Sequence, residues 1–174
     1  MKRKIYISGN ELSLAEYLSD IDDPETYDNW LDPETQSGYN YRMTDTYEEY
    51  HSRVWQQRFL AVILRNSDSR VIGTVSLSPD YLEPDLAIRL YRPFRGQGYG
   101  TDAFALAMKY CFDAFSLNKI YAGCYEHNTI SLRMLKKCGF VPYPEGNSYE
   151  THFITGLPVT QLSFVRFREG KNGQ

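Results

Sequence analysis

Arg95-Gly96-Gln97-Gly98-Tyr99-Gly100-Thr101 is the stretch of this 174-residue sequence that decides the fold. It follows a predicted strand, Asp85 to Tyr91, and it opens the clearest amphipathic helix of the chain. Glycines at alternate positions let the backbone turn tightly and let a bulky anion approach its N–H groups. At the first turn of a helix, unpaired N–H groups and the positive end of the helix dipole point at one spot. The stretch therefore predicts a site for a phosphate or a diphosphate.

Two better-known phosphate loops do not match. A Walker loop needs Gly-x4-Gly-Lys-Ser/Thr, and no Lys-Ser or Lys-Thr follows a glycine pair here. A dinucleotide fingerprint needs Gly-x-Gly-x-x-Gly, but Gly96, Gly98 and Gly100 are one residue too close, and Ile120 stands where the ribose-binding acid belongs. A glycine-rich connection that binds nothing is the remaining alternative.

The composition indicates one soluble globular domain over residues 1–174, with 42% hydrophobic and 15% aromatic residues. The longest apolar run, Phe59 to Leu64, is too short to cross a bilayer, and the first residues lack a signal-peptide core. We therefore expect a cytoplasmic protein that does not associate with membranes.

Cysteine and histidine are too scattered to predict a disulfide framework or a metal site. They stand at Cys111, Cys124 and Cys138 and at His51, His127 and His152. Cys124 lies on a predicted strand without a paired histidine or a helix N-terminus, so we expect a buried thiol and not an acyl-enzyme nucleophile.

Residues 11–50 are strongly acidic, with 12 of the 22 acidic residues and, of the 19 basic ones, only Arg42. Such a surface disfavours nucleic acid and favours cationic ligands, although acidic stretches are often simply solvated. Aromatic and acidic residues alternate here and could enclose a cation: Trp30, Tyr39, Tyr41, Tyr47 and Tyr50 with Asp28, Asp32, Asp45, Glu48 and Glu49.

The first third of the chain predicts a strand over Lys4 to Ser8 and two helices. Ser13, with Glu16 in the capping-box position, starts a helix that ends before Pro24. Asp22 to Tyr41 is expected to be irregular, with one helical turn around Tyr27 to Leu31. Thr46 caps a second helix that runs to about Gln57.

The rest of the chain predicts a mixed α/β layer structure. Phe59 to Arg65 and Val71 to Ser78 form a hairpin about the turn Asn66 to Ser69. The helix after the glycine loop carries Phe104, Ala107, Met108, Cys111, Phe112 and Phe115 on one face. Then follow a strand, a helix that ends at Gly139, and two more strands: Asn118 to Cys124, Thr129 to Lys137, Tyr149 to Thr155 and Thr160 to Phe167.

From Asp85 to Phe167 the sequence resembles the GNAT N-acetyltransferases, in the branch of RimJ/RimL ribosomal-protein and spermidine acetyltransferases. The resemblance rests on Arg95-x-x-Gly98-x-Gly100, Asn128-x-x-Ser131, Lys137-Cys138-Gly139-Phe140 and Phe153-Ile154-Thr155-Gly156. It implies a mostly antiparallel central sheet of about six or seven strands, with a V-shaped splay between strands 4 and 5 and about four flanking helices. Residues 85–140 would form the acetyl-CoA-binding core, and residues 1–60 would supply acceptor-side helices.

The resemblance also implies the cofactor contacts. Backbone N–H groups of Gln97 to Thr101 would hold the coenzyme A diphosphate, and pantetheine would lie in the splay, bonded to free backbone near Leu90, Tyr91 and Arg92. Asn128 would bond the pantetheine arm. Lys137, with Arg133 and Lys136, could reach the outer phosphates, or these cations could be solvated. The full set expected at the cofactor is Leu90, Tyr91, Arg92, Arg95, Gly96, Gln97, Gly98, Tyr99, Gly100, Thr101, Asn128, Ser131 and Lys137.

Acetyl transfer to an amine needs a base, because alkylammonium has a pKa near 10. Asp85, Glu150 and His152 are the candidates, and alternation along a strand would place the last two on one face. Family members often protonate the thiolate with a tyrosine at the position that Leu135 occupies here. Ser131 is the substitute that we expect, although a packing or capping role is an alternative.

The sequence thus predicts direct transfer of an acetyl group from acetyl-CoA to a primary amine. A polyamine, an aminoglycoside-like compound or a protein N-terminus fits the acidic arm. A catalytically silent acyl-CoA-binding or regulatory domain, and a purely structural α/β domain, remain as alternatives. We expect a monomer or homodimer that uses no metal.

Overall fold

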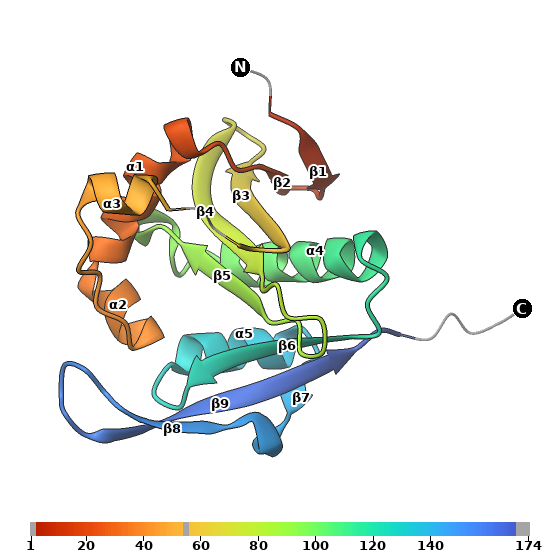
Figure 1. The fold of residues 1–174 in the computed structure, drawn as a ribbon. Helices are drawn as coiled ribbons and strands as arrows, with labels where there is room; N and C mark the ends of the chain where they lie inside the picture. The colour runs from red at the N-terminus through yellow and green to blue at the C-terminus, as the bar shows by residue number, and fades with distance from the viewer. Residues whose placement is uncertain (1–2, 54–55, 170–174) are drawn as a thin grey trace, which may run out of the picture.

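The computed structural model describes residues 3–53 and 56–169. Its strands form two antiparallel sheets. The first contains β1 (Ile5–Ser8), β2 (Leu12–Glu16), β3 (Phe59–Arg65), β4 (Arg70–Leu77) and β5 (Leu86–Leu90), in that order (Figure 1). The second contains β6 (Lys119–Tyr125), β7 (Val141–Pro142), β8 (Ser148–Thr151) and β9 (Pro158–Phe167). The β3–β4 hairpin confirms the predicted one.

The two sheets join at a single described point and then diverge. Asp85 and Tyr121 form an isolated parallel bridge, and the Tyr121 N–H donates to the Pro84 carbonyl at 2.9 Å. Beyond this bridge, β5 pairs with β4 on one side and β6 pairs with β9 on the other. The predicted V-shaped splay between the fourth and fifth strands is therefore present, as the splay between β5 and β6.

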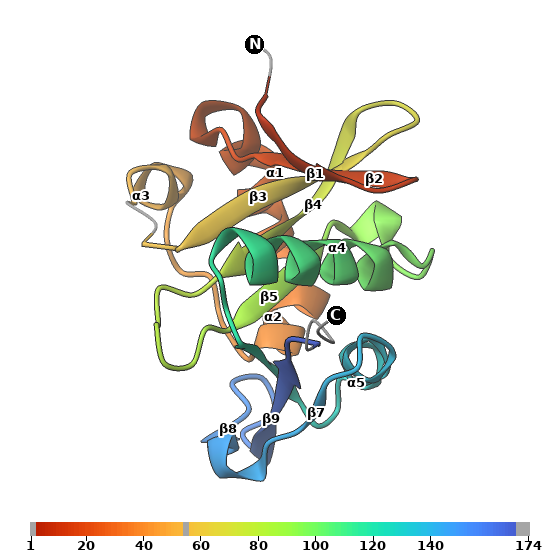
Figure 2. The same ribbon diagram turned by 90° about the vertical axis from the view of Figure 1, so that its right-hand side faces the viewer.

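Helix α4 (Tyr99–Ala114) covers one face of the five-stranded sheet (Figure 2). Ala103, Phe104, Ala107 and Cys111 of this helix are fully buried, and the last three belong to the predicted apolar face. They pack into a core shared with the sheet, in which Leu14, Ile63, Val75, Leu77 and Leu86 are almost inaccessible to solvent. Burial of these apolar side chains is the main source of the domain's stability.

Helix α5 (Thr129–Lys137) begins and ends where the sequence predicts. The Asn128 side chain caps it by accepting from the Ser131 N–H at 3.1 Å. Gly139 follows with a φ of 76°, the left-handed conformation that ends helices and that glycine adopts without cost. Leu135 of α5 is buried and belongs to the hydrophobic core.

The prediction of a helix starting at Ser13 is wrong, because residues 12–16 form β2. This strand pairs with β3, with Leu14 opposite Ile63, and the Ser13 hydroxyl donates to Asn66 Oδ1 at 2.8 Å instead of capping a helix. Leu12 and Leu14 enter the core at strand spacing. Pairing with a distant strand thus overrides a local capping-box signal.

Residues 22–41 are also more regular than predicted. Helix α1 (Ser19–Leu31) runs through Pro24, and its start is fixed by Asp22, whose carboxylate accepts from the Leu18 N–H at 2.7 Å. Arg3 binds the same carboxylate with two contacts of 2.6 Å. Helix α2 (Pro33–Tyr39) follows directly, capped by Asp32.

Helix α3 (Tyr47–His51) has the predicted capping box of Thr46 and Glu49 but ends earlier than expected. The predicted extension to Gln57 passes through residues outside the described part. Strand β8 is shorter than predicted, because residues 153–155 form a turn. Within residues 3–53 and 56–169, every helix is too short or too polar to cross a lipid bilayer.

Candidate functional site

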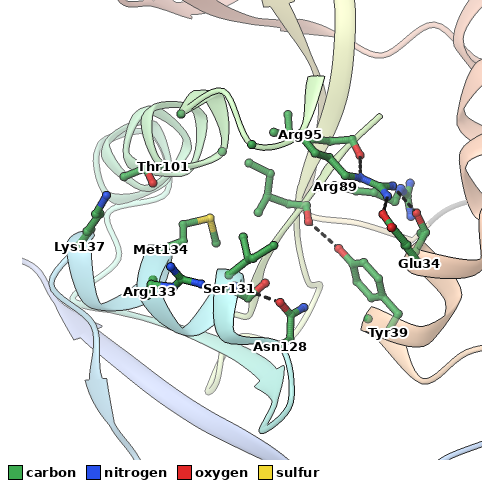
Figure 3. Close-up of a pocket in the computed structure, with 18 residues that line it drawn as sticks. Glu34, Tyr39, Arg89, Arg95, Thr101, Asn128, Ser131, Arg133, Met134 and Lys137 are labelled. Atoms are coloured by element: carbon green, nitrogen blue, oxygen red, sulfur yellow. Dashed lines mark hydrogen bonds and ion pairs between the residues drawn. The ribbon is translucent and has the colours of Figure 1, made fainter. Parts of the chain in front are cut away.

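A cavity of about 520 Å³ opens between α2, β5, the glycine loop and α5, and we call it the main cavity (Figure 3). Ile88, Arg89 and Leu90 of β5 form its floor. The remaining wall residues come from α2, from the loop that starts α4, and from α5, on which Arg133, Met134 and Lys137 are labelled in Figure 3. The sequence brings these segments together because the splay leaves one edge of β5 uncovered.

The glycine loop forms the head of the main cavity. Gly96 and Gly98 have φ values of 75° and 90°, which only glycine adopts readily, and a side chain at either position would point into open space. Gly98 is the N-cap of α4 and has no side-chain cap. Among the described residues, no acceptor bonds the N–H groups of Gly98, Tyr99 or Gly100. This helix start is therefore open to an anion.

The free edge of β5 runs along the same cavity. Tyr91 donates its N–H to Ile72 of β4, so the alternation of an antiparallel ladder turns the backbone groups of Ile88 and Leu90 toward the splay. Tyr39 donates its hydroxyl to the Ile88 carbonyl at 2.6 Å. Within the described chain, the N–H groups of Ile88 and Leu90 have no acceptor.

Of the expected residues Leu90, Tyr91 and Arg92, only Leu90 turns a free N–H group toward the splay, and Ile88 adds a second one. Tyr91 points into the protein, where its hydroxyl lies 2.8 Å from Thr26 Oγ1, and Arg92 lies outside the main cavity. Gln97 and Tyr99 also lie outside its lining, and the Gln97 side chain braces the loop by donating to the Pro93 carbonyl at 2.8 Å.

A second cavity of about 220 Å³, the splay cavity, continues from the main one between β5 and β6. Asp85, Ala87, Cys124 and Tyr125 line it, and Tyr39, Asn128 and Ser131 line both cavities. Burial raises the pKa of Asp85 to about 6. Burial also raises the pKa of Cys124 to about 11, so this residue is a thiol at neutral pH, as expected.

Helix α5 forms the second wall. Asn128 uses its oxygen as the helix cap, so its amide nitrogen remains the group available to a ligand. The Ser131 hydroxyl faces both cavities. Arg133 folds back on its own helix, donating to the Thr129 carbonyl at 3.1 Å, whereas Lys137 lies at the cavity edge without an ion pair among the described residues.

Helix α2 forms the opposite wall, and Arg95 attaches it to the glycine loop. The Arg95 guanidinium donates to Asp32 at 2.7 Å, to Glu34 at 3.0 Å and to Thr35 at 2.6 Å, and its Nε donates to the Leu90 carbonyl at 3.0 Å. Burial acts to raise the pKa of Asp32, but the bonds from Arg95 and Thr35 outweigh it and lower that pKa. Arg95 thus lines the main cavity, but its N–H groups already donate to other protein atoms.

Residues 12–141 match the family model described as the acetyltransferase (GNAT) domain. The chain belongs to the GNAT acetyltransferase family. It is 32% identical over 114 residues to the probable N-acetyltransferase YjcK of Bacillus subtilis, an alignment that covers 63% of this chain and 57% of that protein. The chain therefore spans little more than half the length of this relative.

Solved structures share the GNAT fold. A spermidine N-acetyltransferase from Vibrio cholerae, in complex with CoA and spermine, has a TM-score of 0.78 at 20% identity, covering 91% of this chain and 96% of that one. A ribosomal-protein-S5-alanine acetyltransferase from Vibrio fischeri has a TM-score of 0.74 at 19% identity, covering 92% and 95%. The fold class predicted from the sequence is confirmed.

Two candidate bases lie outside both cavities of the GNAT domain. Glu150 is exposed and accepts from Asn40 at 3.0 Å and from the Tyr125 hydroxyl at 2.8 Å, and these bonds lower its pKa. His152 is buried beside Ser37, whose hydroxyl lies 3.4 Å from Nε2. Since β8 ends at Thr151, strand alternation does not extend to His152.

Several of the aromatic and acidic residues that were expected to enclose a ligand cation instead contact other residues of the protein. The Arg89 guanidinium lies 4.0 Å from the Trp30 ring, where a ligand cation was expected. Asp32 is bound to Arg95, Asp45 pairs with Arg53, and Tyr47 stacks on His51. The acidic arm thus uses much of its charge and aromatic surface within the fold.

Sequence reasoning missed Arg89 and Tyr125 as cavity residues. Arg89 belongs to a predicted strand and falls on the same face as Asp85 by simple alternation, whereas Tyr125 lies one residue beyond the predicted strand Asn118 to Cys124. Tyr125 lies at the end of β6, where burial and the bond to Glu150 raise its pKa to about 12.

Among the described residues, no three His, Cys, Asp or Glu side chains gather as metal ligands.

Proposed function

We propose that this protein transfers an acetyl group from acetyl-CoA directly to a primary amine. The observation that carries the proposal is the continuity of the main and splay cavities, which leads from an open helix N-terminus along the free edge of β5 to the half-buried carboxyl of Asp85. Membership of the GNAT family supports it, as does the relative that is a probable N-acetyltransferase.

The cavities suit an extended thioester carrier. The open N–H groups of Gly98, Tyr99 and Gly100 fit its diphosphate, and the N–H groups of Ile88 and Leu90 fit the amides of its pantetheine arm. The Asn128 amide faces the same passage and can donate to a pantetheine carbonyl. Arg95 acts as a positioning residue, because its donors already hold α2 against the loop.

Asp85 is the base in this proposal. With a pKa of about 6 its carboxylate is ionised at neutral pH and still close to the pH at which a general base is most effective. It takes a proton from the amine, directly or through a water molecule. The amine nitrogen then bonds to the thioester carbonyl carbon, and the carbon–sulfur bond breaks. Ser131 passes a proton to the departing thiolate and regains one from the acetylated nitrogen, which loses its second proton as the carbon–sulfur bond breaks.

Thiol release from acetyl-CoA, measured with a panel of primary amines and checked by mass spectrometry of the product, tests the proposal. We expect amine-dependent release and an acetylated amine. CoA binding without turnover on any amine would instead favour the silent acyl-CoA-binding domain.

A further inference from the structure

Arg89 is a cation without an acidic partner. Its one hydrogen bond among the described residues is from Nη2 to the Thr74 hydroxyl, at 3.3 Å. Its Nε is buried and bonds to no described atom, and no described carboxylate lies within ion-pair distance of it. The Trp30 ring stacks on the guanidinium and fixes its place. An uncompensated charge at such a position is costly unless an anion neutralises it.

Arg89 faces a small cavity of about 90 Å³ between the sheet and helices α1 and α3. Ser76 and Gln57 also line this cavity, and their side chains make no hydrogen bond to the described part of the chain. A guanidinium, a hydroxyl and an amide that converge on one space are the donors that bind a carboxylate. The size of the cavity suits a single small anionic group.

The small cavity and the splay cavity border the same part of β5. Ser76, which lines the small cavity, pairs with Ala87, which lines the splay cavity. Directly paired side chains on one face have Cβ atoms about 5 Å apart. Asp85, Ala87 and Arg89 alternate along this face, so the base and the cation stand about 13 Å apart at their Cα atoms with only alanine between them.

We propose that Arg89, with Ser76 and Gln57, binds a carboxylate on the acceptor, so that the substrate is a small amino acid-like amine and not a simple polyamine. This assignment rests on the proposed function and adds the second point of attachment. The amine reaches Asp85 in the splay cavity while the carboxylate is held at Arg89. The two contacts together orient the nitrogen toward the thioester.

The test compares acceptors that differ in the carboxylate alone. Initial rates of thiol release are measured at fixed acetyl-CoA with ω-amino acids, from β-alanine to ε-aminohexanoate, and with alkylamines of the same chain length. We expect kcat/KM to favour one or more of the amino acids over the matched amine by roughly tenfold to a hundredfold. Alkanoates, which carry the carboxylate but no amine, should inhibit acetylation of that amino acid competitively. Such inhibition would show that a carboxylate alone occupies the site.

Variants locate the preference. R89Q should abolish the preference, because KM for the amino acid should rise to about that of the matched alkylamine, and R89K should restore part of it. R58Q is the matched control, because Arg58 stacks on the exposed Tyr81 ring at 3.9 Å and lines none of the three cavities. It should leave the preference intact. Melting temperatures verify that each variant is folded.

Equal use of amines and amino acids, a preference that persists in R89Q, or binding of CoA with turnover of neither series would overturn the carboxylate site. The first two results leave the proposed acetyl transfer standing. Failure to bind CoA would refute the proposed function itself, and the two failures are therefore distinguishable.

Discussion

The two walls of the main cavity are built in different ways. The wall formed by the glycine loop and the start of α4 offers backbone N–H groups that positive φ angles at Gly96 and Gly98 hold in place. The wall formed by α2 is attached by side chains, through the bonds of Arg95 to Asp32 and Thr35 and of Tyr39 to the Ile88 carbonyl.

This difference matters for how each wall responds to change. A backbone site depends on the conformation of a few residues and has no charge of its own to titrate or screen. The α2 wall depends on ionised groups and on the geometry of a planar guanidinium. Mutations at the first wall should therefore act on the thioester carrier, and those at the second on stability and the acceptor.

Replacing Asp85, the base that we propose in the splay cavity, should have the largest effect. We expect D85N to lower kcat by about 10²- to 10⁴-fold at neutral pH, the usual contribution of a positioned base. Because burial raises the pKa of Asp85 to about 6, wild-type activity should fall as the pH drops through about 6, and this limb should be absent in the variant. A pH profile of kcat that is the same in both proteins would contradict this role.

The same substitution should stabilise the fold. A carboxyl whose pKa is raised to about 6 from an ordinary 3.8 contributes most to stability below pH 4, and the contribution is lost as the pH rises through 6. At pH 8 the free energy of unfolding of D85N should therefore exceed that of the wild type by up to about 3 kcal/mol, and D85N should melt at a higher temperature. At pH 4 the melting temperature of D85N should be no higher than that of the wild type.

The backbone wall is tested by G98A. Alanine at a φ of 90° is strained, so the loop must shift its N–H groups, and we expect KM for acetyl-CoA to rise about tenfold while acceptor KM changes little. G156A is a matched control, since Gly156 has a φ of 69° and equally open surroundings, but lies in the β8–β9 turn. Equal effects of both variants on KM would show that the loop conformation is irrelevant to the carrier.

The side-chain wall is tested by R95Q, which removes the contacts between α2, the glycine loop and β5. We expect an unfolding free energy lower by about 2 kcal/mol and a rise of about threefold to tenfold in acceptor KM. R168Q breaks a comparable pair with Asp113 at the C-terminal end of α4, and it should leave KM unchanged because neither residue lines the main or the splay cavity. Denaturant unfolding and steady-state kinetics measure both, and an unchanged acceptor KM in R95Q would separate α2 from acceptor binding.

The smallest effect is expected from E150Q. Glu150 is exposed and outside both cavities, and glutamine can still accept from the Tyr125 hydroxyl, so kcat should change by less than about threefold. A loss as large as that of D85N would identify Glu150, acting through Tyr125, as the base. Steady-state rates of the two variants at the same pH decide between them.

The sequence predicts best what local backbone chemistry decides. The bounds of α5 follow from Asn128 and Gly139, and the start of α4 follows from the glycine loop, because each is set within a few residues. The position of β5 was predicted from the sequence pattern, and the splay followed from the resemblance to the GNAT family. These elements carry the expected donor site.

The N-terminal segment, which we propose as the acceptor side, was harder to predict because its conformation depends on distant partners. Residues 12–16 carry a helix-like spacing but pair with β3, and Arg3, a remote residue, binds the Asp22 carboxylate that fixes the start of α1. Sequence alone also did not show that Arg89 stacks on Trp30, which removes the cage expected around a ligand cation. Such contacts join residues far apart in the chain.

Calorimetric titration of CoA into the wild-type protein and into G98A tests the central claim most directly. We predict one saturable site per chain in the wild type and binding about tenfold weaker in the variant. Absence of heat in the wild type, or equal affinity in both proteins, would contradict a diphosphate site at the open start of α4.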